Sequence, residues 1–136
     1  MSRVQLALNV SNMTEAIVFY TKLFGCEPAK IRDGYANFSI AEPPLKLVLI
    51  EKPDEAGTLN HLGVEVESTD VVQQAIARLQ DEGMSTLVED QTTCCYAVQD
   101  KVWVDGPDAE KWEIYTVLAD APVMKIVPVA EGECCA

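Results

Sequence analysis

Alternating apolar and polar positions open the chain. Val4, Leu6, Leu8 and Val10 alternate with polar or small residues, and this period of two predicts a half-buried strand at 4–10. Asn12 with Glu15 three residues later marks a helix start, and Gly25 marks its end. The apolar face expected of this helix is Met13, Ala16, Ile17, Tyr20, Leu23 and Phe24. Short strands are expected next at about 28–31, 35–41 and 45–51, separated by Asp33-Gly34 and Pro43-Pro44.

The same order of elements starts again at 61–67, HLGVEVE, where apolar and polar residues alternate once more. Ser68 or Thr69 can cap a second helix that Gly83 ends. Its predicted apolar face consists of Val72, Ala75, Ile76 and Leu79. Strands are expected at 85–89, 101–105 and 112–118. Two copies of one βαβββ unit predict an α+β fold with pseudo-twofold symmetry, in which mixed sheets line a cleft.

The length of 136 residues suits one domain with a single core. We expect this domain at 1–118, with its units at about 3–52 and 59–118. Gln5 and His61 take the same place in the two units, and the small Ala7 and Gly63 follow them on the face that the helix leaves uncovered. Residues 119–136 contain prolines, lack a clear period and end in EGECCA, so they are expected to form a loosely held tail.

Charge narrows the range of partners. The formal net charge of -12 would repel nucleic-acid phosphates and anionic lipids, so neither nucleic acid nor a membrane is expected as a partner. The sequence has no apolar run long enough to span a bilayer, and Met1 to Val10 lacks a secretory leader. We therefore expect a cytoplasmic protein that binds a small molecule or a metal. Monomer and homodimer both remain open.

The repeated unit, the strand opening HLGVEV and the turn-plus-strand GPDAEKWEIY resemble the vicinal oxygen chelate superfamily of glyoxalases, bleomycin-resistance proteins and extradiol dioxygenases. The resemblance covers roughly residues 3–118. It implies metal ligands on the first strand of each unit and on the last strand of one unit, and Gln5, His61 and Glu113 hold those places. His61 is also the only histidine of the chain. A lone histidine is more often a satisfied polar group, and for Gln5 that simpler interpretation stays open because a water could replace the amide.

This ligand set limits the metal and the chemistry. One imidazole, one carboxylate and one amide oxygen leave coordination positions open and resemble the facial triad that binds Fe(II). Glyoxalase I has a fourth ligand, a carboxylate on the last strand of the other unit. Here Lys46 or an apolar neighbour in LKLVLIE is expected at that place, which argues against glyoxalase chemistry.

Four of the five cysteines form adjacent pairs, Cys94-Cys95 and Cys134-Cys135, and Cys26 beside Gly25 is expected to be structural. Neighbouring residues on a regular strand point to opposite faces, so Cys94 and Cys95 can bind one atom only where the backbone is irregular. The segment EDQTTCCYAVQDK is therefore predicted to contain a loop. Two soft thiolates match the two exchangeable positions of a methylated trivalent arsenic, whereas zinc would need four ligands. Burial of both cysteines as small apolar residues is the alternative.

The thiol pair and the stretches YANF, PPLKLVLIE, HLGVEVE and CCYAVQDKVWV closely resemble the iron-dependent lyases that cleave the carbon-arsenic bond, a family that includes cadmium-induced proteins. The resemblance implies that Cys94 and Cys95 hold a trivalent methyl- or aryl-arsenical while Fe(II) on Gln5, His61 and Glu113 activates dioxygen, which releases arsenite. Cys134 and Cys135 would be an accessory arsenic trap or have no role. The competing interpretations are a non-enzymatic module that binds cadmium or arsenic, and another metal-dependent enzyme such as a glyoxalase or an antibiotic-modifying transferase.

Overall fold

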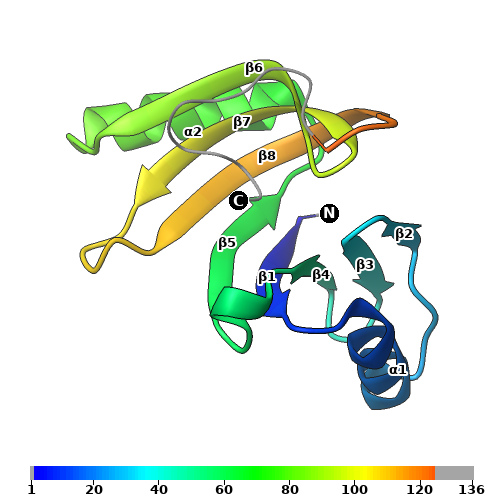
Figure 1. Ribbon diagram of the computed structural model, residues 1–136. Coiled ribbons are helices and arrows are strands. Elements are labelled where there is room, and N and C mark those ends of the chain that lie inside the picture. Colours follow the sequence, from blue (N-terminus) through cyan, green and yellow to red (C-terminus); the bar gives the residue numbers. More distant parts are fainter. Residues whose placement is uncertain (1, 125–136) are drawn as a thin grey trace. The chain divides into compact units, whose positions relative to one another are not determined.

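The computed structural model describes residues 2–124, which fall into two compact units, Arg3–Leu62 and a second that begins at Gly63. The elements of the first are β1 (Arg3–Val10), α1 (Met13–Phe24), β2 (Lys30–Arg32), β3 (Tyr35–Ile40), β4 (Leu45–Glu51) and the 3-10 turn η1 (Pro53–Glu55). Strand β5 (Leu59–Glu65) leads from the first unit into the second. The second continues with α2 (Thr69–Asp81), β6 (Thr86–Cys94), β7 (Ala97–Asp105) and β8 (Lys111–Asp120). The predicted α+β class and the repeated order βαβββ are confirmed (Figure 1).

The sheet of the first unit runs in the order β2, β3, β4, β1. It is mixed, because β1 pairs with β4 in parallel and the other neighbours are antiparallel. Helix α1 begins as predicted, with the Asn12 side chain accepting a hydrogen bond from the Glu15 backbone N–H, and Gly25 ends it in the left-handed region at φ 69°. Its apolar face packs on Phe38 and Leu47. Leu23, expected on that face, is 58% exposed, so this part of the prediction was wrong.

In the second unit β7 lies between β6 and β8, and both pairs are antiparallel. Ser68 is the N-cap of α2 and accepts from the backbone N–H of Val71. The predicted apolar face of α2 is buried at all four positions, Val72, Ala75, Ile76 and Leu79. Val72, Ile76 and Leu79 form one core cluster with Val102 of β7, against which Ile114 of β8 packs, so α2 covers one face of this sheet (Figure 1). The opposite face carries the polar residues described below.

Strands β6 and β7 are longer than the sequence pattern predicted. The segment expected to separate two strands around Cys94-Cys95 is mostly strand, since β6 runs to Cys94 and β7 starts at Ala97. A tight two-residue turn replaces the predicted loop. The pattern concealed this hairpin because Glu89, Asp90 and Gln91 interrupt the apolar alternation, and a register shift between Glu89 and Thr92 accommodates them.

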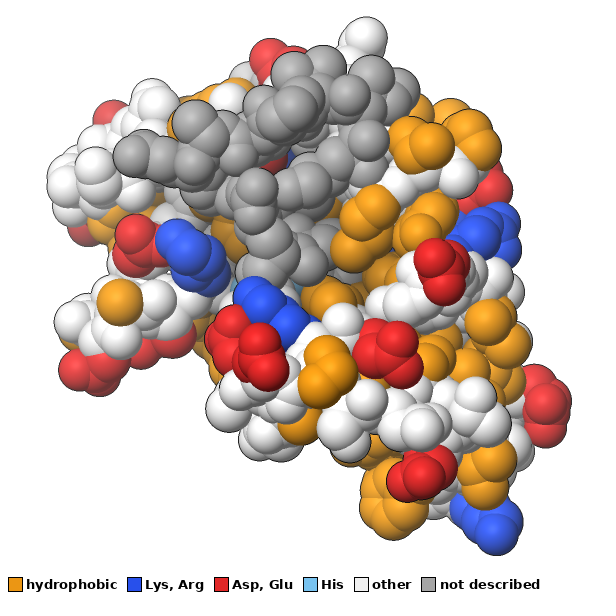
Figure 2. All heavy atoms as spheres, in the orientation of Figure 1, with side chains coloured by type: hydrophobic (Ala, Val, Ile, Leu, Met, Phe, Trp, Pro, Cys, Tyr) orange, Lys and Arg blue, Asp and Glu red, His pale blue; other side chains and the backbone are white. Residues whose placement is uncertain are grey.

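Within residues 2–124 no helix is both long and apolar enough to cross a bilayer. Acidic side chains are spread over the visible face of the molecule instead of gathering in one patch (Figure 2).

Candidate metal and thiol sites

Two predicted metal ligands lie side by side in the first unit. Gln5 on β1 and His61 on β5 are 4% and 2% exposed, and the Nε2 atoms of their side chains are 3.2 Å apart. The two residues at equivalent positions of the repeat are therefore in direct contact. A half-turn of the amide about its last bond would bring the Gln5 Oε1 atom to the position of Nε2 and offer an oxygen beside the imidazole.

A chain of hydrogen bonds orients the imidazole of His61. Its Nδ1 lies 2.7 Å from the Asn60 Oδ1 atom, an oxygen that can only accept, so Nδ1 carries the proton and Nε2 carries the lone pair. Asn60 donates to Asn9 Oδ1 at 2.9 Å, and Asn9 donates to the Thr58 hydroxyl at 2.9 Å. Metal-binding histidines are typically held by such partners at the other ring nitrogen, which fixes the tautomer that ligates. The surroundings of His61 fit metal binding through Nε2.

Lys46 occupies the neighbouring place on β4. It pairs with Gln5 across the parallel β1–β4 ladder, and paired residues of adjacent strands point to the same face. A lysine therefore stands beside Gln5, where the sequence comparison of the two units expected it and where a carboxylate would be needed for a fourth protein ligand.

Glu113, the third predicted ligand, belongs to the second unit. It pairs with Trp103 across β8 and β7, so it lies on the sheet face opposite α2. Its carboxylate Oε1 accepts a hydrogen bond from Lys101 Nζ at 2.7 Å, and the two side chains are 3% and 0% exposed. The ammonium also lies 5.2 Å from the ring centroid of Trp103 and 5.7 Å from that of Tyr115. A buried, hydrogen-bonded cation thus holds Glu113 in place and compensates its charge.

The thiol pair sits at the tip of the β6–β7 hairpin. Cys94 pairs with Ala97 across the hairpin, and the two turn residues Cys95 and Tyr96 have φ of 53° and 60°. Two central residues in the left-handed region are typical of a type I′ turn, which usually takes asparagine or glycine. The turn brings Cys94 Sγ and Cys95 Sγ to 3.5 Å from each other. The predicted irregular backbone is confirmed, although as a turn and not a loop.

Gln99 connects this tip to the rest of the sheet. Its Nε2 donates to the backbone carbonyl of Cys94 at 2.9 Å, while its Oε1 is buried without a hydrogen-bond partner among the described residues. Both ladders are irregular at this level, between Glu89 and Thr92 on one side of β7 and between Val98 and Gln99 on the other. The hairpin tip is therefore joined to the sheet through a zone of interrupted pairing.

The thiols and Glu113 are separated along the sheet. Ala97 pairs with Cys94 and Trp103 pairs with Glu113, and at about 3.3 Å per residue this register places the two sites ~20 Å apart along β7. Both sites are nevertheless on the same three strands. Chemistry that uses both would require the tip to approach Glu113.

Other cysteines and clusters add little to this picture. Cys26 packs against the core of the first unit, as a structural residue would. Cys134 and Cys135 lie outside the described residues. Among residues 2–124, no group of three or more His, Cys, Asp or Glu side chains is placed to bind a metal ion. Of the three predicted ligands, only His61 and Glu113 are of these types, and the third is the amide of Gln5. The predicted metal site therefore remains a prediction.

Sequence reasoning missed three residues that organise these sites. Asn60 directly precedes His61, and an amide next to a candidate ligand could have been noticed as its hydrogen-bond partner. Lys101 looked like an ordinary strand lysine, and only its alternation with Trp103 placed it on the face of Glu113. No sequence signal marks Gln99, because its role depends on the turn at Cys95 and Tyr96.

The chain matches a known superfamily and several named relatives. Residues 3–114 match the Glyoxalase/Bleomycin resistance protein/Dioxygenase superfamily. The cadmium-induced protein CadI of Mycobacterium tuberculosis is 58% identical over 99% of this chain and 93% of its own length. A trivalent organoarsenical cleaving enzyme of Thermomonospora curvata is 57% identical over 99% of this chain and 89% of its own.

Solved structures share the fold at lower identity. The Mn(II)-bound glyoxalase of Novosphingobium aromaticivorans has a TM-score of 0.62 and 18% identity, and the match covers 98% of this chain and 45% of that one. At this level of identity the likeness establishes the fold and nothing about the reaction.

Proposed function

The chain belongs to the Glyoxalase/Bleomycin resistance protein/Dioxygenase superfamily, and from this premise we propose that it cleaves the carbon-arsenic bond of trivalent methyl- or aryl-arsenicals and releases arsenite. The proposal includes dependence on Fe(II) and dioxygen. The observation that carries it is the adjacent pair Cys94 and Cys95, whose sulfur atoms lie 3.5 Å apart and, when reduced, are close enough to bind one atom. The relative of Thermomonospora curvata, named as a trivalent organoarsenical cleaving enzyme, supports it.

In their reduced form, Cys94 and Cys95 would hold the substrate. A trivalent arsenical with two hydroxyl groups can exchange both for the sulfurs of Cys94 and Cys95 and release two molecules of water, which leaves its single carbon substituent attached. Soft sulfur ligands favour soft thiophilic elements of this kind. Because the tip lies ~20 Å along β7 from Glu113, the loaded tip would have to bend toward the sheet.

Gln5, His61 and Glu113 would hold the metal. His61 presents Nε2 because Asn60 occupies Nδ1, and the hydrogen bond from Lys101 orients the Glu113 carboxylate. Imidazole, carboxylate and amide oxygen suit a divalent iron with open coordination positions. Bound Fe(II) would supply the activation of dioxygen. The proposal requires the two units to bring Glu113 beside the pair formed by Gln5 and His61.

The decisive experiment loads the full chain anaerobically with Fe(II), adds a trivalent methylarsenical, admits oxygen, and measures inorganic arsenite against an oxygen-free control. Arsenite that forms only with iron, oxygen and both thiols supports the lyase. His61→Ala should abolish its formation at the metal step and Cys94→Ser at the substrate step. Absence of both binding and arsenite with methyl and phenyl substrates would end the arsenical proposal.

A second candidate is a module that sequesters cadmium or arsenic without turnover, which the name of the Mycobacterium tuberculosis relative favours. Tight binding without arsenite in the same experiment would select it. Glyoxalase activity is less favoured, since Lys46 stands beside Gln5 on the neighbouring strand. A contribution of Cys134 and Cys135 as an accessory trap is tested by their double serine variant, which we expect to stay active.

A further inference from the structure

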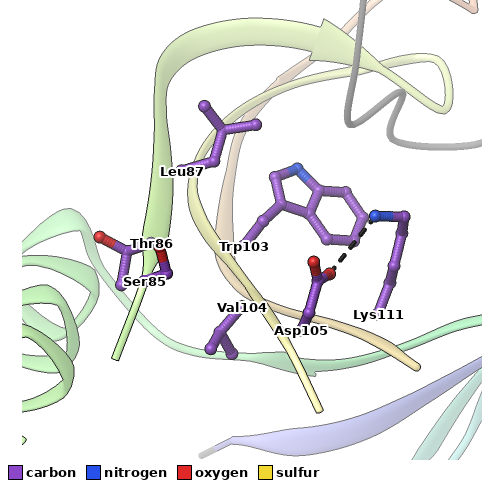
Figure 3. A pocket seen from close by; sticks show the side chains of 7 residues that line it. All are labelled: Ser85, Thr86, Leu87, Trp103, Val104, Asp105 and Lys111. Carbon is purple, nitrogen blue, oxygen red and sulfur yellow. Dashed lines mark hydrogen bonds and ion pairs between the residues drawn. The ribbon is translucent and has the colours of Figure 1, made fainter. Parts of the chain in front are cut away.

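A pocket of about 230 Å³ opens beside Glu113 in the second unit. Three strands contribute to its wall, through Leu87 of β6, Trp103 of β7 and Lys111 of β8. Figure 3 shows these side chains around the pocket, with the ion pair of Lys111 and Asp105 drawn at its polar side. Neither the proposed metal ligands nor the thiol pair line this pocket.

One side of the pocket wall is apolar. The indole N–H of Trp103 donates to Glu89 Oε1 at 3.0 Å, which fixes the ring, and Trp103 is 5% exposed. Leu87 is 44% exposed, so much of its side chain is available to a ligand. An apolar cavity of about 150 Å³ is enough to hold benzene, and aromatic rings pack favourably against indole in edge or offset geometries. The pocket is therefore large enough for one substituted phenyl ring.

The opposite side of the pocket offers polar contacts. Lys111 Nζ lies 3.3 Å from Asp105 Oδ1, and the two side chains are 47% and 63% exposed. Both can exchange this contact for a ligand at little cost, because exposed ion pairs contribute little. A hydroxyl or nitro group on the ring would find a donor and an acceptor there.

The register of the strands ties this pocket to Glu113. Leu87, Trp103 and Glu113 are directly opposite one another on β6, β7 and β8, so their side chains share one face. Along β7 the thiol turn comes first, Lys101 with its partner Glu113 next, and the pocket last. Once the bent tip had carried a bound arsenical to Glu113, the carbon substituent would lie beside Trp103, which pairs with Glu113.

We propose that the pocket of Leu87, Trp103 and Lys111 is the subsite for the organic substituent, and that it makes the enzyme selective for monocyclic arylarsenicals over methylarsenicals. This inference rests on the proposed function, which by itself does not distinguish methyl from aryl substrates. A methyl group would leave the pocket unfilled, whereas a phenyl ring would contact both Leu87 and Trp103.

The first test uses a neutral aromatic probe that needs neither thiols nor metal. Binding of 4-fluorophenol to the full chain is followed by ¹⁹F NMR for the wild type, Leu87→Ala and the matched control Val88→Ala. Val88 is 38% exposed, but it pairs with Val102, which packs toward α2, so it lies on the other face. We expect saturable binding that weakens about tenfold in Leu87→Ala and is unchanged in Val88→Ala. Absent binding, or equal loss in both variants, would overturn the subsite.

The second test measures turnover of phenyl and methyl substrates by the iron-loaded enzyme. The ratio of kcat/KM for the phenyl to the methyl compound should fall about tenfold in Leu87→Ala and stay at the wild-type value in Val88→Ala. An unchanged ratio in Leu87→Ala refutes the selectivity. If neither compound is turned over, the proposed lyase function fails, and the fluorophenol result alone decides whether the pocket binds aromatic rings.

Discussion

Replacing Lys101 with methionine removes the cation from the buried pair with Glu113. The change keeps much of the volume packed against Trp103 and Tyr115 but leaves a carboxylate with 3% exposure uncompensated. Loss of one partner of a buried ion pair costs about 3–5 kcal/mol in unfolding free energy. At roughly 4 °C per kcal/mol for a chain of this length, the Tm should fall by ~12–20 °C.

Thermal and urea unfolding of metal-free Lys101→Met measure this effect, with Lys111→Met as the matched control. Lys111 forms an ion pair with Asp105, but both of these side chains are exposed. Loss of the Lys111 charge should therefore lower the free energy of unfolding by no more than about 1 kcal/mol. The variant Glu113→Gln and the double variant complete a cycle. We expect the double variant to be at least about 2 kcal/mol more stable than the sum of the single effects, because no buried charge is left unpaired.

Two results would refute this reasoning. Additive single effects would mean that Lys101 and Glu113 do not act as a pair, and a Lys101→Met loss no larger than that of Lys111→Met would mean that burial does not amplify the interaction. Adding Co(II) gives a further check on the proposed ligand. A divalent ion at Glu113 should raise the Tm of Lys101→Met more than that of the wild type, because it supplies the missing positive charge.

The other predictions concern the ligands and the thiol tip. His61→Ala and Glu113→Ala should each abolish iron binding after anaerobic reconstitution while Gln5→Ala weakens it less, and full occupancy in the first two would remove the proposed metal site. Asn60→Leu should lower metal affinity about 10–100-fold through loss of the Nδ1 partner, as measured by Co(II) titration; an unchanged affinity would contradict the role of Asn60. Cys94→Ser and Cys95→Ser should lose arsenical binding but keep iron, whereas the Cys134 and Cys135 double variant should stay active. Gln99→Leu should weaken phenylarsenical binding to the thiols without changing metal affinity, since it removes the bond to the Cys94 carbonyl.

Sequence periodicity predicted those elements whose faces differ sharply in polarity. The buried face of α2 follows from Val72, Ala75, Ile76 and Leu79, because helical spacing and burial agree at every position. Periodicity failed for β6, where the polar run after Glu89 forms a bulge that hides the strand. It also missed the turn, since Cys95 and Tyr96 carry none of the residues that usually signal positive φ.

The candidate site was predictable only where one residue carries the information. His61 could be singled out as the lone histidine of the chain, and Gln5 as its counterpart in the repeat. The side chains that position the candidate ligands could not be predicted from the sequence. Lys101 acts on Glu113 from a neighbouring strand, and its burial depends on packing among Trp103 and Tyr115, which no spacing along the chain encodes.

The two units differ most at the hairpin that follows the helix. In the first unit β2 and β3 span three and six residues and turn at Asp33-Gly34, where Gly34 adopts φ 68° without a side-chain penalty. In the second, β6 and β7 span nine residues each and turn at Cys95-Tyr96, where neither residue is glycine. Left-handed backbone costs roughly 1–2 kcal/mol at each such residue. The turn of the longer hairpin places two sulfurs at 3.5 Å. A turn that served only to connect the strands would be more stable with asparagine and glycine, so the positive φ angles at Cys95 and Tyr96 support the proposed binding role of this tip.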